Sequence, residues 1–333
     1  MAVGELGGIA EIEGWTQPRL QPLLLRILIT LGRFARRKPL GAFCGLIVIC
    51  FVIVGDLVPE TVNKISRTAG IADRPVPYFI DILERNTGIV QPYGKQDLRD
   101  RLADPSSKHL LGTDSIGRDI FSRLLYGART AVMVSFGAVF LTEVIALAIG
   151  ITCAYYGKLV DKLGYRIVDV FDALPDLIVL ITILGIFGTG LWQMIFVIAF
   201  LQGPPGSRII RGQAISVMAS PYLEAGRVLG ASDLRLMLRY ILPNIFALVI
   251  LASTLRLGRV VLLEASLSFL GYGLPPPYPS WGQMLSLEGR EYMRTQPGLA
   301  IYPGLAIGLL VFSYNLFGDA LRDVLDPRLR GSR

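Results

Sequence analysis

The sequence predicts an all-α integral membrane protein, and three observations lead to this prediction. Of the 333 residues, 52% are hydrophobic and 18% are charged, whereas soluble domains carry about 25% charged residues. Several apolar stretches reach about 20 residues, which is enough for a helix to cross the hydrocarbon core of a bilayer. The net charge of +7 is not gathered into a basic patch interleaved with aromatic residues. It is therefore explained by loop lysines and arginines that set membrane topology, not by nucleic-acid binding.

Residues 1–38 are predicted to lie in the cytoplasm. Residues 20–31 are apolar with Arg26 inside, and because this stretch is too short to span, it predicts an amphipathic helix on the membrane surface. A basic cluster ends the segment: Arg33, Arg36, Arg37 and Lys38. Because positive residues beside a span favour the cytoplasmic side, we expect a cytoplasmic N-terminus and a first span at residues 39–58.

Residues 59–129 are predicted to form a long extracytoplasmic loop that ends in an ordered turn and helix. The last part, His109–Arg129, reads H-L-L-G-T-D-S-I-G-R-D-I-F-S-R-L-L-Y-G-A-R. Its glycines allow turns that other residues resist, and its charged side chains can pair with one another. These residues are Gly112, Asp114, Gly117, Arg118, Asp119 and Arg123. The single histidine, His109, is expected to be structural.

Residues 130–322 are predicted to form a core of five further spans. They are expected at about 131–155, 167–188, from 191 onward, 243–270 and 299–318. The run G-P-P-G at 203–206 is expected to kink or break the fourth span. Three aspartates in the first turns of the third span suit the positive end of its dipole, and we expect them to cap and to pair with Arg166: Asp169, Asp172 and Asp176. The sequence thus predicts six spans in total. An even number of spans puts both termini on the same side of the membrane, and the charge of the loops predicts that this side is the cytoplasm, with a cytoplasmic tail at 323–333.

Charged residues also fall within the predicted spans, where charge is costly and usually faces protein or a water-filled path. They are Glu143 in the second span and Arg256, Arg259 and Glu264 in the fifth. One interpretation is that they line a translocation path. The other is a structural ion pair between helices, and the sequence weighs the two interpretations equally.

The stretch 220–243 is the longest polar interruption between two apolar blocks in the second half of the chain. It predicts a short helix, a glycine turn and a second helix. Ser220 can cap the first helix, Pro221 suits its first turn, and Gly230 ends it. Ser232 and Asp233 can cap the second helix, which Pro243 is expected to kink or end. A helix this short needs a surface to pack against.

The same stretch resembles the E-A-A, x3, G, x9, I-x-L-P loop of ABC importer permeases. The residues that match are Glu224, Ala225, Gly230, Leu242 and Pro243. Two positions depart from the pattern, because Gly226 stands for the second Ala and Tyr240 for the Ile. The resemblance implies a cytoplasmic coupling helix that fits a groove on an ATPase subunit.

Further blocks resemble the same family. Residues 112–123 resemble the G-T-D-x-x-G-R-D-x-x-S-R signature of its dipeptide/oligopeptide/nickel branch. Residues 264–285 resemble L-S-F-L-G-L-G-x-Q-P-P-x-P-S-W-G-x-M-L, with Tyr272 and Pro275 departing, and residues 318–330 resemble the C-terminal signature. The resemblance implies a type I ABC importer permease fold in the prokaryotic plasma (inner) membrane.

The sequence contains no G-x-x-x-x-G-K-[ST] phosphate loop and no recognisable catalytic, cofactor or metal site. We therefore expect a non-catalytic permease that binds no cofactor, with ATP and magnesium on partner ATPase subunits. The resemblance further implies a second homologous permease subunit and an extracytoplasmic substrate-binding protein.

The resulting functional prediction is a permease subunit that imports di- or oligopeptides. The resemblance leaves dipeptides, longer peptides and nickel chelates open as solutes. An alternative is an ion-coupled secondary transporter that uses Glu143 and Glu264 as ion-binding groups. A third hypothesis is a membrane anchor without transport activity.

Overall fold

The computed structural model describes residues 35–36, 38–54 and 90–325. The predicted surface helix at 20–31, the first part of the extracytoplasmic loop and the end of the tail lie outside the described residues. Within the described residues all regular elements are helices, and the only extended pairing is an isolated bridge between Thr113 and Asp119. The predicted all-α class is confirmed for this part of the chain.

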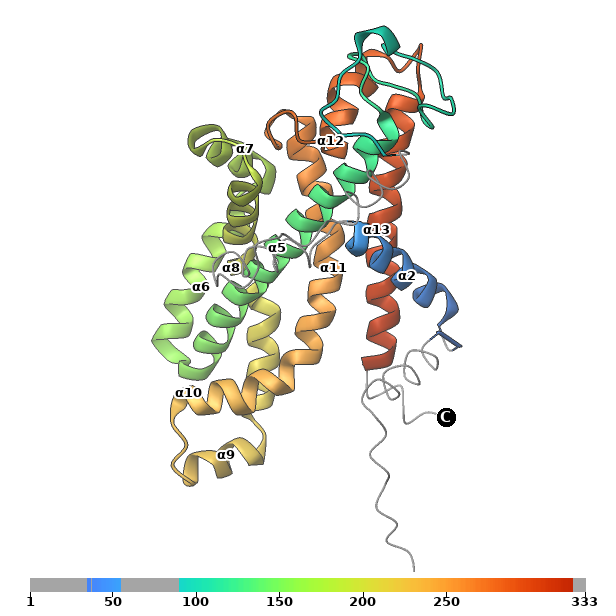
Figure 1. Ribbon diagram of the computed structural model, residues 1–333. Helices are drawn as coiled ribbons and strands as arrows, with labels where there is room; N and C mark the ends of the chain where they lie inside the picture. The colour runs from blue at the N-terminus through green and yellow to red at the C-terminus, as the bar shows by residue number, and fades with distance from the viewer. Residues whose placement is uncertain (1–34, 37, 55–89, 326–333) are drawn as a thin grey trace, which may run out of the picture.

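The helices follow one another along the chain as labelled in Figure 1. The 3-10 turn is η1, and η2 and η3 are π-helical turns. The elements are α2 (Pro39–Val54), η1 (Leu98–Asp100), α5 (Ile120–Tyr156), α6 (Lys158–Ala173), α7 (Asp176–Phe187), α8 (Leu191–Met218), α9 (Pro221–Val228), α10 (Asp233–Leu236), η2 (Met237–Ile241), α11 (Leu242–Phe269), α12 (Trp281–Met284), η3 (Leu285–Gly289) and α13 (Gly298–Leu325).

Among the described residues, three helices are long and apolar enough to cross a membrane: Ile120–Tyr156, Asp233–Phe269 and Gly298–Val324. α6 and α7 meet this criterion together but are bent by 89°. The region predicted as a straight span at 167–188 is therefore two helices with a sharp bend between them. The bend falls at Leu174, which is extended because the following Pro175 disfavours a helical conformation for the residue before it.

The predicted break in the fourth span is also wrong, because α8 continues through Pro204 and Pro205. Side-chain donors supplement the backbone there: Ser207 Oγ donates to the Pro204 carbonyl at 2.6 Å. The glycines serve close packing instead, since a Cβ at Gly203 would lie 2.6 Å from the Ile145 side chain on α5. α5 and α8 form the most extensive helix pair of the described fold.

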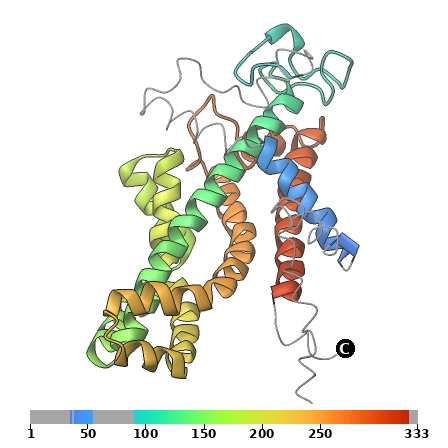
Figure 2. The ribbon, with the colours of Figure 1, turned by 60° about the horizontal axis from the view of Figure 1, so that its bottom comes forward.

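The two ends of the molecule differ in structure. Figures 1 and 2 both place α9 and α10 at one end and the loop of residues 90–119 with α12 at the other. A large apolar core surrounds Trp281 and Tyr314 near α5, α11 and α13, and a second core lies beneath α9. α2 packs on α13 through Gly41, whose Cβ would overlap that of Ala320, as small residues allow between membrane helices.

Candidate functional site

The helix–turn–helix predicted for residues 220–243 is confirmed, and we call this region the coupling end. α9 ends in a Schellman motif. Gly230 has φ +78°, its N–H donates to the Arg227 carbonyl at 3.0 Å, and the Ala231 N–H donates to the Gly226 carbonyl at 3.1 Å. Gly230 therefore provides the left-handed residue on which the turn depends.

The predicted side-chain caps of the coupling end are wrong. Ser220 and Ser232 hold the N-cap positions, but within the described residues neither side chain makes a cap hydrogen bond. Asp233 instead accepts a hydrogen bond from Tyr155 Oη at 2.7 Å. The start of the second helix is thereby tied to the end of α5.

Pro243 does not end the second helix. The helix runs from Asp233 to Phe269 and passes through the π turn η2. Proline lacks the N–H that would bond to the carbonyl four residues earlier, and the ladder widens so that the Leu242 N–H donates to the Met237 carbonyl. Asn244 Nδ2 adds a hydrogen bond to the Tyr240 carbonyl at 2.7 Å. Figure 1 shows the helix changing direction in this region.

α9 has a buried face and an exposed face. Leu223 is fully buried against an apolar cluster that includes Leu236, Ile241 and Ile210. Glu224 and Ala225 are exposed, and the end of the loop is more so: Val228 is 86% and Leu229 84% exposed. The tip of this firmly packed helix therefore presents two adjacent apolar side chains at its surface.

The intramembrane charges are brought together in part. Arg256 Nε donates to Glu143 Oε1 at 3.1 Å, and the two side chains are 15% and 8% exposed. Arg256 Nη1 also donates to the Gln202 carbonyl at 3.4 Å. Arg259, with a side chain 66% exposed, pairs with Asp176 at 2.7 Å. α11 is thus linked to α5, α8 and α7, which supports the interpretation of structural pairs between helices.

Glu264 lies apart from this group. It is fully buried, and its Oε1 accepts hydrogen bonds from Ser268 Oγ and Ser280 Oγ, both at 2.8 Å. Ser280 belongs to the proline-rich turn before α12. Glu264 therefore anchors that turn to α11, and the sequence signal for it was the P-S-W-G block.

The predicted pairing of the third-span aspartates with Arg166 is wrong. Asp169 and Asp172 both pair with Arg208 at 2.7 Å, and Asp176 pairs with Arg259. The bent α6 lies along α8, so its acidic face meets the basic end of that helix.

The signature predicted to be extracytoplasmic, residues 112–123, forms a buried ion network. Asp114 Oδ1 accepts the backbone N–H of Arg118 at 2.8 Å, and its Oδ2 accepts from Arg118 Nε at 2.5 Å. Arg118 Nη2 donates to Glu288 Oε1 at 2.8 Å, and Arg123 Nε lies 3.7 Å from Asp114 Oδ2. Burial, followed by the Asp114 carboxylate, raises the pKa of Glu288 to about 7. Glu288 was missed, since no local pattern links it to a residue 170 positions earlier.

Asp119 caps α5 within the same block. Its Oδ2 accepts the Ser122 N–H at 2.8 Å, and its Oδ1 lies 3.0 Å from His109 Nδ1. His109 is buried between Asp119 and Asp100, so its predicted structural role is confirmed. Hydrogen bonds from Lys108 and then His109 hold the pKa of Asp100 below its ordinary value.

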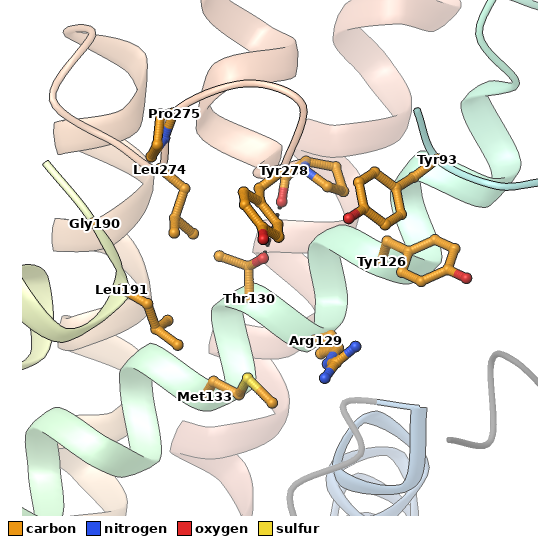
Figure 3. Close-up of a pocket in the computed structure, with 11 residues that line it drawn as sticks. Tyr93, Tyr126, Arg129, Thr130, Met133, Gly190, Leu191, Leu274, Pro275 and Tyr278 are labelled. Atoms are coloured by element: carbon orange, nitrogen blue, oxygen red, sulfur yellow. Dashed lines mark hydrogen bonds between the residues drawn. The ribbon is translucent and has the colours of Figure 1, made fainter. Parts of the chain in front are cut away.

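A cavity of about 380 Å³ opens at the outer end of α5. Figure 3 shows Tyr93, Tyr126 and Tyr278 gathered on one side of it, with Leu191 and Leu274 on the other. Tyr93 makes an edge contact with Tyr126 at 4.7 Å and stacks on Tyr278 at 6.1 Å. The lining suits an apolar or aromatic group.

The described residues contain no group of three or more His, Cys, Asp or Glu side chains that could hold a metal ion.

Known proteins resemble most of this chain. Residues 146–331 match the family described as binding-protein-dependent transport system inner membrane component. The glutathione transport system permease protein GsiD of Pectobacterium atrosepticum is 40% identical over 232 residues, covering 69% of this chain and 77% of that protein. The dipeptide transport system permease protein DppC of Alkalihalophilus pseudofirmus is 37% identical over 238 residues, covering 72% and 78%. An inward-facing structure of the MetNI methionine ABC transporter aligns with 61% of this chain and 96% of its own, at 21% identity and a TM-score of 0.49.

The family match includes the entire coupling end and both intramembrane arginines. These relatives are ABC permeases, so the alternative of an ion-coupled transporter using Glu143 and Glu264 is not favoured. The long apolar helices and the relatives together make this a multi-pass inner-membrane protein. The chain therefore belongs to the binding-protein-dependent transport system inner membrane component family, the permease subunits of ABC importers.

Proposed function

We propose that this chain is the non-catalytic permease subunit of an ATP-driven importer of di- or oligopeptides. The observation that carries the proposal is the coupling end, where the apolar tip of α9 is exposed on a helix fixed by a Schellman motif and a buried face. Such a surface suits a cytosolic ATPase subunit. The peptide class is supported by the glutathione and dipeptide relatives.

The proposed topology has six spans and both termini in the cytoplasm. The spans are α2, α5, the bent pair α6–α7, α8, α11 and α13. This arrangement puts α9 in the cytosol and puts residues 90–119 and α12 outside, where an extracytoplasmic binding protein would deliver substrate.

In the proposed importer each subunit has a different role. Two ATPase subunits bind ATP and magnesium, while this chain binds no cofactor of its own. A second homologous permease subunit completes the pore, and α11 borders the path through it. Arg256, held by Glu143 at 3.1 Å, and Arg259, held by Asp176 at 2.7 Å, fix α11 in place beside this path.

The test is co-purification from the native membrane in mild detergent, with the wild type and Glu224→Lys. We expect the wild type to retain an ATPase with a phosphate-binding loop, and Glu224→Lys to lose most of it and to lose uptake, since reversing a charge in a docked interface opposes binding. The matched control is Glu291→Lys, an equally exposed reversal outside the coupling end. A wild type that retains no ATPase would contradict the proposal.

A further inference from the structure

The two residues of the coupling end that depart from the family pattern lie against each other. Gly226 is buried on α9, and Tyr240 lies in the π turn η2. A Cβ built at Gly226 would lie 3.3 Å from Cε1 and Cζ of Tyr240 and 3.0 Å from Cδ2 of Leu236. Both distances are shorter than ordinary van der Waals contact between carbon atoms. The tyrosine ring thus occupies part of the space in which an alanine methyl would lie.

Helix propensity alone would not place a glycine here. Alanine is the better helix former, and α9 has only eight residues, so each weak position matters to it. Gly226 is helical and is not among the glycines with positive φ. An alanine methyl at this position would therefore require both Leu236 and Tyr240 to shift.

Tyr240 lies within the π turn. Pro243 removes a backbone donor, and the turn from Met237 to Ile241 is wider than an α-helical turn. Tyr240 is half-buried, and its carbonyl is held by Asn244. The orientation of the ring is thus set by the backbone that joins α9 to the membrane helix.

We infer that Tyr240 is a positioning residue of the coupling helix: its ring, seated on Gly226, sets the angle at which α9 rests on α10 and η2. This inference rests on the proposed function. A force applied to α9 by the ATPase passes through this contact into a helix that is continuous to Phe269. That helix carries Arg256, which is paired with Glu143 on α5.

The test is a double-mutant cycle in the complete transporter, purified with its ATPase and reconstituted in proteoliposomes. The variants are Gly226→Ala, Tyr240→Ile and the two combined. The readouts are ATPase retained per permease, uptake of labelled dialanine and of labelled glutathione, and ATP hydrolysed per peptide imported.

Gly226→Ala is expected to lower uptake about fivefold and to raise the ATP used per peptide, because the added methyl group displaces the Tyr240 ring. The effects of two residues in contact are not additive, so the combined variant tests this contact. Tyr240→Ile alone is expected to impair coupling in the same direction, since it leaves the space beside Gly226 unfilled. The combined variant is expected to return to within about twofold of wild type.

The matched control is Gly212→Ala on α8, where a Cβ meets no described atom within 4 Å; its uptake should equal wild type. Gly226→Ala that behaves like this control would overturn the inference, as would a combined variant no better than Gly226→Ala. Rescue by the second substitution separates positioning from simple loss of folding. A wild type without bound ATPase would instead reject the proposed function itself.

Discussion

Single residues in this molecule are fixed by charge pairs that cross helices. Arg256 and Glu143 are nearly buried and lie 3.1 Å apart, whereas Arg259 and Asp176 form a pair that is largely exposed on the arginine side. Removing one partner of a buried pair leaves the other charge uncompensated, which costs far more than losing an exposed pair.

We predict that Glu143→Ala lowers the free energy of unfolding by about 3 kcal/mol, measured by thermal denaturation of the detergent-purified protein. Arg259→Ala should cost about 0.5 kcal/mol, because solvent screens its pair. The combined Glu143→Ala, Arg256→Met variant should recover most of the loss. Equal effects of Glu143→Ala and Arg259→Ala would contradict the buried pair.

The pH dependence of stability should contain a contribution from Glu288. Its pKa is raised from 4.5 to about 7, so the folded state binds more protons than the unfolded state in this window. Its stabilising contribution is complete below about pH 4.5 and is lost as pH rises through about 7. We predict that Glu288→Gln flattens the fall in melting temperature between pH 5 and 8, which melting curves of both proteins would test. Parallel curves would disprove this role.

The sequence alone did not predict which charged side chains of the site pair with one another. The sequence predicted that the charged residues of the 109–129 block pair with one another, and Asp114 and Arg118 do so. It could not identify Glu288 or Arg208 as partners, since these contacts depend on how distant helices pack. Glu264 was placed with the arginines, but it bonds to two serines instead.

At the scale of elements, α9 depends on how it ends. Gly230 adopts φ +78°, and a Cβ there meets no described atom within 4 Å. Any cost of substitution is therefore conformational and not steric. At Gly226, by contrast, the cost of a substitution comes from steric contact with neighbouring side chains.

We predict that Gly230→Ala destabilises the turn by about 1 kcal/mol and that Gly230→Val costs more, while Gly230→Asn is tolerated best. The measurement is ATPase retained per permease after purification. Gly212→Ala serves as the control for a helical glycine in open space. Equal retention by Asn and Val at residue 230 would show that the left-handed conformation is not required.

Helix positions were largely predictable because apolar runs are long, but their interruptions were not. Pro175 bends the chain by 89°, whereas Pro204 and Pro205 leave α8 continuous. Pro175 precedes the first residue of α7, and Leu174 before it is extended, whereas Pro204 and Pro205 lie inside α8. Pro243 follows a π turn at which the helix changes direction without ending.

The whole molecule has two structurally different ends, so its proposed orientation in the membrane can be tested directly. We predict that Val228→Cys, 86% exposed in the native protein, reacts with a membrane-impermeant maleimide only in inside-out vesicles. Tyr278→Cys, 52% exposed, should react in spheroplasts. The parent protein with its native Cys44, Cys50 and Cys153 gives the background. Labelling of both sites from one side would contradict the proposed six-span topology.

α5 connects these ends without a break. It begins after Asp119, beside the buried ion network, and ends at Tyr156, and Tyr155 in its last turn donates a hydrogen bond to Asp233 at the start of α10. Its 37 residues extend about 55 Å at 1.5 Å per residue, well beyond the hydrocarbon thickness of about 30 Å. A tilt of about 5° around the outer cap moves the inner end by roughly 5 Å. A continuous helix of this length joins the ion network at one end of the molecule to α10 at the other, so a change in its tilt would move both ends together.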